Sequence, residues 1–344
     1  MLPAPPQTNP GIEIVLANAN FADPATATRH RLWTPAAIGE FAQEAGYNGV
    51  EWSPVWPLVG TQRRITRAVA SGSLVLSSLH AGFADRHPLE APEPNYSLQA
   101  KVLGSVAGRL AVVSVQQSCS WMRALQAKLA TGCTTAECSA LDEVHYPVFY
   151  GAGYDTDANS ARTLWQNDDC NHRLMLQPTD WIAKALGVHD IVSMSARLKR
   201  RGFDMDYPFV MDTHHMRRSE KGVPRVVSSI DKSLGDLAQR TGEIHLSLAR
   251  LDMMQGMKAE DTMCEARCAV SESGRFTGQL KDILTAALER GGVRRIVVEA
   301  PAQYLELLLE STSRPTLLGA YAIIAAKTRG FANQVRAQTN SRIV

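Results

Sequence analysis

The sequence has no long apolar run, no CxxC cysteine pair and no marked excess of charge of either sign. A membrane-spanning helix requires about 18 uninterrupted apolar residues, and no stretch of the chain approaches that length. The 36 Lys and Arg residues nearly balance the 34 Asp and Glu residues, which excludes a broad electrostatic attraction to nucleic acid or to an anionic membrane. Any anionic ligand must therefore be held by a local cluster of basic side chains.

Cysteine is also sparse, with six residues in 344, so neither a disulfide scaffold nor a zinc ribbon is indicated. The spacings of Cys133 and Cys138 and of Cys264 and Cys268 are compatible with a shared metal, but isolated pairs of this kind are more often free thiols. The N-terminal segment MLPAPPQTNPG lacks the basic and apolar regions of a secretory signal. We therefore predict a cytoplasmic protein whose residues 1–9 form a flexible tail.

The apolar content is sufficient for one large folded domain. Hydrophobic residues make up 45% of the chain and charged residues 20%, a balance that excludes general disorder. The length exceeds the usual 100–200 residues of a domain, but it suits an α/β barrel, which needs about 250 residues plus additions. We predict a single domain over residues 10–344.

Short apolar or β-branched runs alternate with helical segments, as in parallel βα units. The predicted strands are 11–17, 49–52, 74–80, 110–116, 174–177, 208–212, 243–248 and 295–299. The predicted helices include 34–45, 62–71, 121–131, 181–186, 193–202, 228–241 and 279–290, followed by 301–311 and 316–328 and then a polar tail. Thr34 is placed to cap the first of these helices, with Pro35 in its first turn and Gly46 just beyond its end.

This pattern predicts an α/β fold, specifically a single (β/α)8 TIM barrel with C-terminal helices. The region 118–173 is the least regular part of the chain, because it is rich in Cys, Tyr, Asp and Asn residues. We interpret it as an elaborated loop inserted after the fourth strand.

Polar side chains stand at or near the ends of the predicted strands, namely Glu51, His80, Gln177, Asp212, His245 and Glu299, with His214 and His215 just after Asp212. The C-terminal ends of barrel strands meet at one mouth, so we expect these side chains to converge there. Each residue taken alone is more often a helix cap or a hydrogen-bonded core residue. Together, imidazoles and carboxyls at one mouth indicate a metal site or an acid/base site.

All of these residues except Gln177 lie in five segments: AIGEFAQEAGYNGVEWSP, LSSLHAGF, FVMDTHHMRR, IHLSLARLD and RIVVEAP. They resemble successive strand ends of the xylose isomerase-like TIM barrels. That superfamily includes sugar isomerases, ketose 3-epimerases, hydroxypyruvate isomerase, inosose dehydratase and endonuclease IV. The similarity extends over most of 11–303, but the region 118–173 does not match.

The resemblance implies one divalent metal, Mn, Mg, Zn or Fe, held at four positions that correspond to Gln177, Asp212, His245 and Glu299. It also implies catalytic or substrate-binding roles for Glu299, Gln177 and His215. At Gln177 the sequence departs from the family, which has Glu there. A carboxamide can donate its oxygen to a metal but cannot take a proton. One of the family's two bases is therefore missing: Asp180, Glu51 or a histidine replaces it, or the reaction is a different proton transfer, or catalysis is lost.

Further substrate contacts are predicted near the strand ends. Glu51 and His80 are candidates by position, and Arg217, followed by Arg218, could bind an anionic group of a ligand. Trp52 and Trp181 could stack on a sugar ring. The arginines could equally belong to a solvated surface. The aromatic rings could equally pack at the barrel rim without contacting a ligand.

The leading hypothesis is a metal-dependent isomerase or epimerase of a sugar or sugar derivative, with a sugar-like or anionic small-molecule substrate. The alternative is a divergent, non-catalytic barrel that binds a small ligand or a protein partner through 118–173. The sequence leaves open whether the chain forms a homo-oligomer. A nuclease like endonuclease IV is disfavoured, because nucleic-acid binding needs a basic surface and the predicted fourth strand carries Val115, Gln116 and Gln117 where that branch has a histidine.

Overall fold

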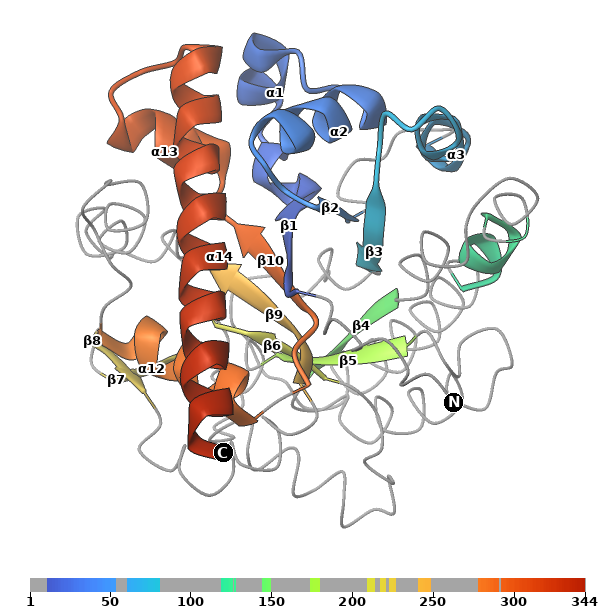
Figure 1. The fold of residues 1–344 in the computed structure, drawn as a ribbon. Helices are drawn as coiled ribbons and strands as arrows, with labels where there is room; N and C mark the ends of the chain where they lie inside the picture. Colours follow the sequence, from blue (N-terminus) through green and yellow to red (C-terminus); the bar gives the residue numbers. More distant parts are fainter. Residues whose placement is uncertain are drawn as a thin grey trace, which may run out of the picture.

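Eight parallel strands form the centre of the protein. The computed structural model describes residues 11–53, 61–80, 119–125, 127, 144–149, 174–179, 209–213, 217–220, 223–226, 241–248, 278–290 and 292–343. The strands are β1 (Glu13–Ala17), β2 (Gly49–Trp52), β3 (Leu76–His80), β4 (Val144–Phe149), β5 (Leu174–Thr179), β6 (Phe209–Asp212), β9 (Thr241–Ser247) and β10 (Arg295–Glu299). Their pairing closes a barrel in the order β1-β10-β9-β6-β5-β4-β3-β2 (Figure 1). The predicted α/β class with a parallel barrel sheet is confirmed.

The fourth barrel strand lies where the sequence predicted a loop. β4 pairs in parallel with both β3 and β5, so the strand between them is 144–149 and not 110–116, which lies outside the described residues. Pro147 interrupts this segment, and proline is rare inside sheets because it cannot donate a ladder hydrogen bond. The region 118–173 also includes helical residues 119–125, which overlap the predicted helix 121–131.

Helices lie on the outside of the barrel in several of the described connections between strands (Figure 1). They are α1 (Pro24–His30), α2 (Pro35–Glu44), α3 (Thr61–Ala70), α12 (Gly278–Arg290), α13 (Ala302–Leu308) and α14 (Arg314–Ile343), preceded by the 3-10 turn η1 (Asn18–Phe21). The predicted helices 181–186 and 193–202 lie outside the described residues, as does 228–240 of the third, and Thr241, its last predicted residue, begins β9. None of the helices in the described part of the chain is long and apolar enough to cross a membrane.

The start and end of α2 follow the sequence signals. The Thr34 hydroxyl accepts a hydrogen bond from the backbone N–H of Ala37 at 3.1 Å, and Pro35 occupies the first turn. Gly46, just past the helix, has φ +80°, a left-handed conformation that glycine adopts without the steric cost of a side chain. These cap predictions are confirmed.

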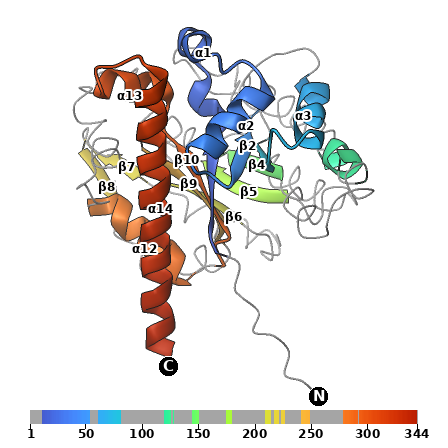
Figure 2. The same cartoon turned by 45° about the horizontal axis from the view of Figure 1, so that its top comes forward.

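The predicted polar tail after Arg329 is wrong, because α14 continues to Ile343. Ala332 and Val335 are buried in this last part and extend the apolar stripe of the helix. Figures 1 and 2 show α14 running along the outside of the barrel, where it contacts β1, α2, α12 and α13. Phe331 packs against the core beside them, and the Arg336 side chain donates to the backbone oxygen of Val293 at 2.6 Å, so this last part of the helix is also held to the fold.

A hairpin follows β6, which the sequence did not predict. β7 (Arg217–Glu220) and β8 (Val223–Val226) form a separate two-stranded antiparallel sheet. Their register pairs Glu220 with Val223, so only Lys221 and Gly222 connect the strands. The predicted ligand-binding residue Arg217 therefore lies on a hairpin strand.

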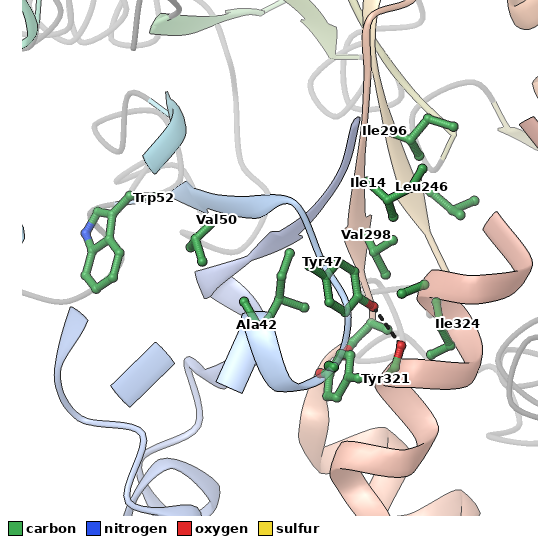
Figure 3. Packing of buried hydrophobic residues seen from close by; sticks show 14 of the residues in the cluster. Ile14, Ala42, Tyr47, Val50, Trp52, Leu246, Ile296, Val298, Tyr321 and Ile324 are labelled. Atoms are coloured by element: carbon green, nitrogen blue, oxygen red, sulfur yellow. Dashed lines mark hydrogen bonds between the residues drawn. The ribbon is translucent and has the colours of Figure 1, made fainter. Parts of the chain in front are cut away.

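Alternation along the strands separates an apolar outer face from a different inner face. Ile14, Val50, Leu246 and Ile296 are buried in the layer between the sheet and the helices (Figure 3). Val15, Ala17 and Val297, at the alternate positions, form their own small cluster. The polar side chains that share this inner face, among them those of Glu51, His245 and Glu299, build the site described below.

The helical layer over β1 and β10 is centred on Tyr321 of α14. Its ring lies 5.6 Å from Phe41 and 6.5 Å from Tyr47, measured between ring centroids. The Tyr47 hydroxyl donates to the backbone oxygen of Tyr321 at 3.2 Å (Figure 3), and the Tyr321 hydroxyl donates to the backbone oxygen of Ala300 at 2.5 Å. The first bond ties α14 to the turn between α2 and β2, and the second ties it to the segment that leaves the C-terminal end of β10.

Two buried asparagines join neighbouring strand ends at the C-terminal side of the barrel. Asn18 donates to the backbone oxygen of Ser53 at 2.9 Å and accepts from its N–H at 2.6 Å. Asn20 donates to the backbone oxygen of Val298 at 2.9 Å and accepts from the N–H of Ala300 at 2.7 Å. The turn after β1 is thereby fixed to the ends of β2 and β10.

Cys119, which is fully buried, is disulfide-bonded, and the sequence did not predict this bond.

Candidate metal centre

The inner face of β9 carries three polar side chains in a row. Glu243, His245 and Ser247 alternate with Ile244 and Leu246, which are part of the outer apolar layer. All three polar residues are buried, and β9 lies between β6 and β10 in the barrel. The side chains of the site therefore come from the inner face of β9 and from the ends of neighbouring strands.

At the C-terminal end, His245 meets the last residues of β6 and β10. Its Nδ1 lies 3.1 Å from Oε1 of Glu299. The hydroxyl oxygen of Ser247 lies 2.6 Å from Oε2 of Glu299 and 3.2 Å from Oδ1 of Asp212, and its one hydrogen is donated to one of these carboxylates at a time. Asp212 and Glu299, distant in sequence, are thus neighbours of one imidazole.

On the other side of the ring, Nε2 of His245 faces two more carboxylates. It lies 3.1 Å from Oε1 of Glu243 and 3.3 Å from Oε2 of Glu51. Glu51 ends up in this position because β2 places it on the inner face, where its Oε2 also accepts a hydrogen bond from the hydroxyl of Ser78 at 3.2 Å. One imidazole therefore contacts carboxylates from three strands.

The electrostatic environment of His245 follows from this arrangement. Complete burial lowers the pKa of the imidazole, but the negative charges of Glu51 and Glu299 and the hydrogen bonds to Glu243 and Glu299 outweigh it. The net effect raises the pKa of His245 well above its ordinary value of 6.5. The cluster is therefore strongly attractive to positive charge.

Asp212, His245 and Glu299 have the geometry and chemistry of a divalent-metal site. One donor atom from each lies within 4.8 Å of the others. Ligand atoms bound to a single ion at about 2.0–2.3 Å have separations of this order or less. Two carboxylates and one imidazole suit Mn, Zn or Fe, and the carboxylates also suit Mg. Glu51, Glu243 and His245 form a second group that meets the same distance criterion.

The structure locates some of the other predicted residues. His80 ends β3, is nearly buried, and its ring centroid lies 5.9 Å from that of His245. Trp52 is 3% exposed and belongs to the outer apolar layer with Val50 (Figure 3), on the face of β2 opposite to Glu51. The ring therefore packs in the core, and the substrate contact proposed for Trp52 stays a prediction.

The remaining predictions fall where side chains are not described. Gln177 lies on β5, where it pairs with Pro147 of β4, and its side chain lies outside the described residues. His215 and Trp181 also lie outside them, while Arg217 lies on β7. The roles assigned to these four residues stay predictions.

The sequence prediction missed Glu243, Ser247 and Ser78, which contact the site directly. The segment EIHLS alternates polar and apolar residues with the period of a strand. This pattern, which places Glu243 and Ser247 on the same face as His245, was the signal available in the sequence.

Comparisons with known proteins find likeness in structure alone. No protein-family profile matches the chain, and no curated protein matches it in sequence. Among solved structures, the D-psicose 3-epimerase from Clostridium cellulolyticum H10, described with D-tagatose, superposes with a TM-score of 0.50 at 11% identity, covering 93% of this chain and 99% of that one. An L-ribulose 3-epimerase superposes with a TM-score of 0.51 at 10% identity, covering 97% and 98%. These values show a shared fold, and the predicted resemblance to xylose isomerase-like barrels is confirmed at that level.

Proposed function

We propose that this chain, which has the fold of the xylose isomerase-like sugar 3-epimerases, is itself a sugar epimerase or isomerase that depends on one divalent metal. The barrel would be a complete (β/α)8 unit spanning 10–344, with the part of 118–173 around β4 as its elaboration. The observation that carries the proposal is the convergence of Asp212, His245 and Glu299 at the C-terminal ends of adjoining strands. Chemistry on barrels of this kind is located at that end.

The charge of the cluster supports a bound cation. Four carboxylates, those of Glu51, Asp212, Glu243 and Glu299, gather around the imidazole of His245. Carboxylate oxygens and imidazole nitrogens are the ligand atoms that divalent metals bind in proteins.

Asp212, Glu299 and Nδ1 of His245 would hold the ion. When bound, a divalent metal polarises a carbonyl or hydroxyl oxygen of the substrate and so acidifies the neighbouring C–H group. Glu299 is the carboxylate best placed to move that proton, because its side chain is 23% exposed whereas that of Glu51 is 2% exposed. Ser247 keeps Glu299 and Asp212 in fixed orientations through its hydroxyl.

Gln177 occupies the fourth metal-ligand position that the resemblance implies. As a carboxamide it would contribute an oxygen ligand but would not act as a base. A single carboxylate can still move a proton between adjacent carbons on one face of a sugar, which is an isomerisation. Inversion at one carbon needs a proton donor on the second face, and His80 and His215 are the candidates for that role.

Deuterium exchange tests this proposal and separates the two reactions. The purified protein, loaded with Mn²⁺, is incubated with D-tagatose or L-ribulose in D₂O, the Mn²⁺ is removed with chelator, and the recovered sugar is examined by proton NMR. Deuterium at C3 indicates epimerisation, and deuterium at C1 or C2 indicates aldose–ketose isomerisation. We expect exchange that is lost with EDTA and falls at least 100-fold in Glu299→Gln, because general acid–base catalysis typically contributes about 10²–10⁴ in rate.

Glu289→Gln on α12 is the matched control, because it makes the same substitution away from the cluster, and it should leave the exchange rate unchanged. A metal-loaded protein that binds sugars of this class without any exchange would contradict the catalytic proposal. That result would favour the alternative, a barrel that binds a small ligand without transforming it.

A further inference from the structure

A second set of charged side chains continues into the barrel interior from His245. Glu243 is fully buried, and its Oε2 accepts a hydrogen bond from Nη1 of Arg295 at 2.9 Å. Nε of Arg295 donates in turn to Oε2 of Glu13 at 3.2 Å. Glu243 and Arg295 are direct partners in the register of β9 and β10, so the sheet itself holds them side by side.

The two oxygens of Glu243 have different partners. Oε2 is bound to Arg295, and Oε1 lies 3.1 Å from Nε2 of His245. A guanidinium presents its N–H groups in a rigid plane, so it restricts the rotation of the carboxylate that it binds. The carboxylate of Glu243 is thereby aimed at one ring nitrogen of His245.

We propose that Glu243, oriented by Arg295, is a positioning residue that fixes the His245 ring with Nδ1 directed at Asp212 and Glu299. The inference rests on the proposed metal centre. An imidazole that binds a metal through one nitrogen is commonly held by a hydrogen bond from its other N–H to a carboxylate, which fixes the ring orientation and the tautomer. Here Glu243 is that carboxylate, with Glu51 at 3.3 Å as the second neighbour of Nε2.

The competing explanation is a second metal ion held by Glu51, Glu243 and Nε2 of His245. Arg295 argues against it, because its guanidinium already neutralises Glu243 at 2.9 Å and would repel a divalent cation bound to the same carboxylate. The two explanations predict different numbers of ions per chain.

The test compares two double variants by calorimetric titration with Mn²⁺ after EDTA treatment. Glu243→Gln/Arg295→Met keeps an oxygen that can accept from Nε2, and Glu243→Leu/Arg295→Met does not. Both variants remove the same two charges, so the comparison isolates the hydrogen bond from the electrostatic effect. We expect Mn²⁺ to bind at least tenfold more weakly to the Leu variant, since loss of such outer partners costs about 10–100-fold in metal affinity.

Glu13→Gln is the matched control, because it removes the other partner of Arg295 without touching His245, and its Mn²⁺ affinity should stay within about threefold of wild type. Equal affinities in the two double variants would overturn the positioning role while leaving the metal centre intact. Two ions per chain in the wild type would overturn it in favour of the second metal site. No Mn²⁺ binding in the wild type would overturn both this inference and the proposed function.

A measurement on the wild-type chain decides the matter if the double variants do not fold. Nitrogen-15 NMR of the Zn²⁺-loaded protein distinguishes the protonated from the metal-bound ring nitrogen, and the His245 signals are assigned by their loss in His245→Gln. We expect a proton on Nε2 and the metal on Nδ1. The opposite assignment would overturn the inference.

Discussion

His245 lies with each ring nitrogen against a different set of carboxylates. Nδ1 faces Glu299, beside Asp212, and Nε2 faces Glu243 and Glu51. The sequence identified Asp212, His245 and Glu299, because each ends or lies within a strand whose apolar pattern is clear. The expected convergence at one mouth, together with the family resemblance, grouped them as ligands of one metal. Which ring nitrogen of His245 faces which carboxylate could not be predicted, because that depends on the side-by-side placement of β6, β9 and β10, which are far apart in the chain.

The first prediction concerns Gln177. Its replacement by Glu should strengthen Mn²⁺ binding by about tenfold, because it would add a third carboxylate to the predicted ligand set. Gln177→Ala, the control, should weaken binding because an oxygen ligand is removed. The measurement is a calorimetric titration of all three proteins. If neither change alters Mn²⁺ affinity, Gln177 is not a ligand, and binding gained only in the Glu variant would contradict a working metal centre in the natural sequence.

Among the elements, those with strong local signals matched their predictions. The cap at Thr34 and Gly46 bounds α2 as expected, and β2 and β10 have the predicted limits. β4 was missed because Pro147 weakens its local pattern, and its place is fixed by pairing with β3 and β5. The hairpin of β7 and β8 was missed because charged residues dominate its first strand.

The second prediction concerns the asparagine that joins β10 to the turn after β1. Asn20→Ala removes two hydrogen bonds and leaves the backbone oxygen of Val298 and the N–H of Ala300 without the partner they have now. We expect a loss of about 2–4 kcal/mol in the free energy of unfolding, measured in urea, because buried polar groups are costly to leave unpaired. Asn333→Ala, at an exposed position of α14, is the control and should change stability by no more than about 0.5 kcal/mol. A loss of stability in Asn20→Ala as small as that of the control would show that these two hydrogen bonds do not stabilise the fold.

The third prediction concerns Glu306, which links α13 to α1. Burial raises the pKa of this carboxyl, but hydrogen bonds and charge interactions with Arg29 and His30 outweigh it and lower the pKa below its ordinary value of 4.5. A carboxyl with a lowered pKa in the folded state stabilises the protein above its unfolded pKa. That stabilisation is lost as the pH falls through the folded pKa.

Glu306→Gln should therefore reduce the free energy of unfolding by about 1–3 kcal/mol at pH 7, and the difference from wild type should shrink below about pH 4. The measurement is urea unfolding across this pH range. Glu40→Gln on the exposed face of α2 is the matched control and should show no such trend. A difference for Glu306→Gln that stays constant with pH would refute the charge-based explanation.

In the whole molecule, barrel closure brings residues 51 and 299 to opposite sides of one imidazole. β2 and β10 are separated by most of the sequence, yet both pair with β1. The alternation of short apolar runs with helical segments predicted the class of fold, and the closed order of strands then determined which strand ends meet. The inner polar residues Glu243 and Arg295 are explained only at this level, because each is buried against a partner from a neighbouring strand.

The central claim is that Asp212, His245 and Glu299 hold one divalent metal ion. The most direct test is equilibrium dialysis of EDTA-treated protein against Mn²⁺, with bound metal measured per chain in the wild type and in Asp212→Asn. We predict one ion per chain in the wild type and a loss of at least tenfold in affinity in the variant, because a carboxamide replaces a charged ligand. A wild-type protein that binds no Mn²⁺, or an Asp212→Asn variant that binds it as tightly, would contradict the account.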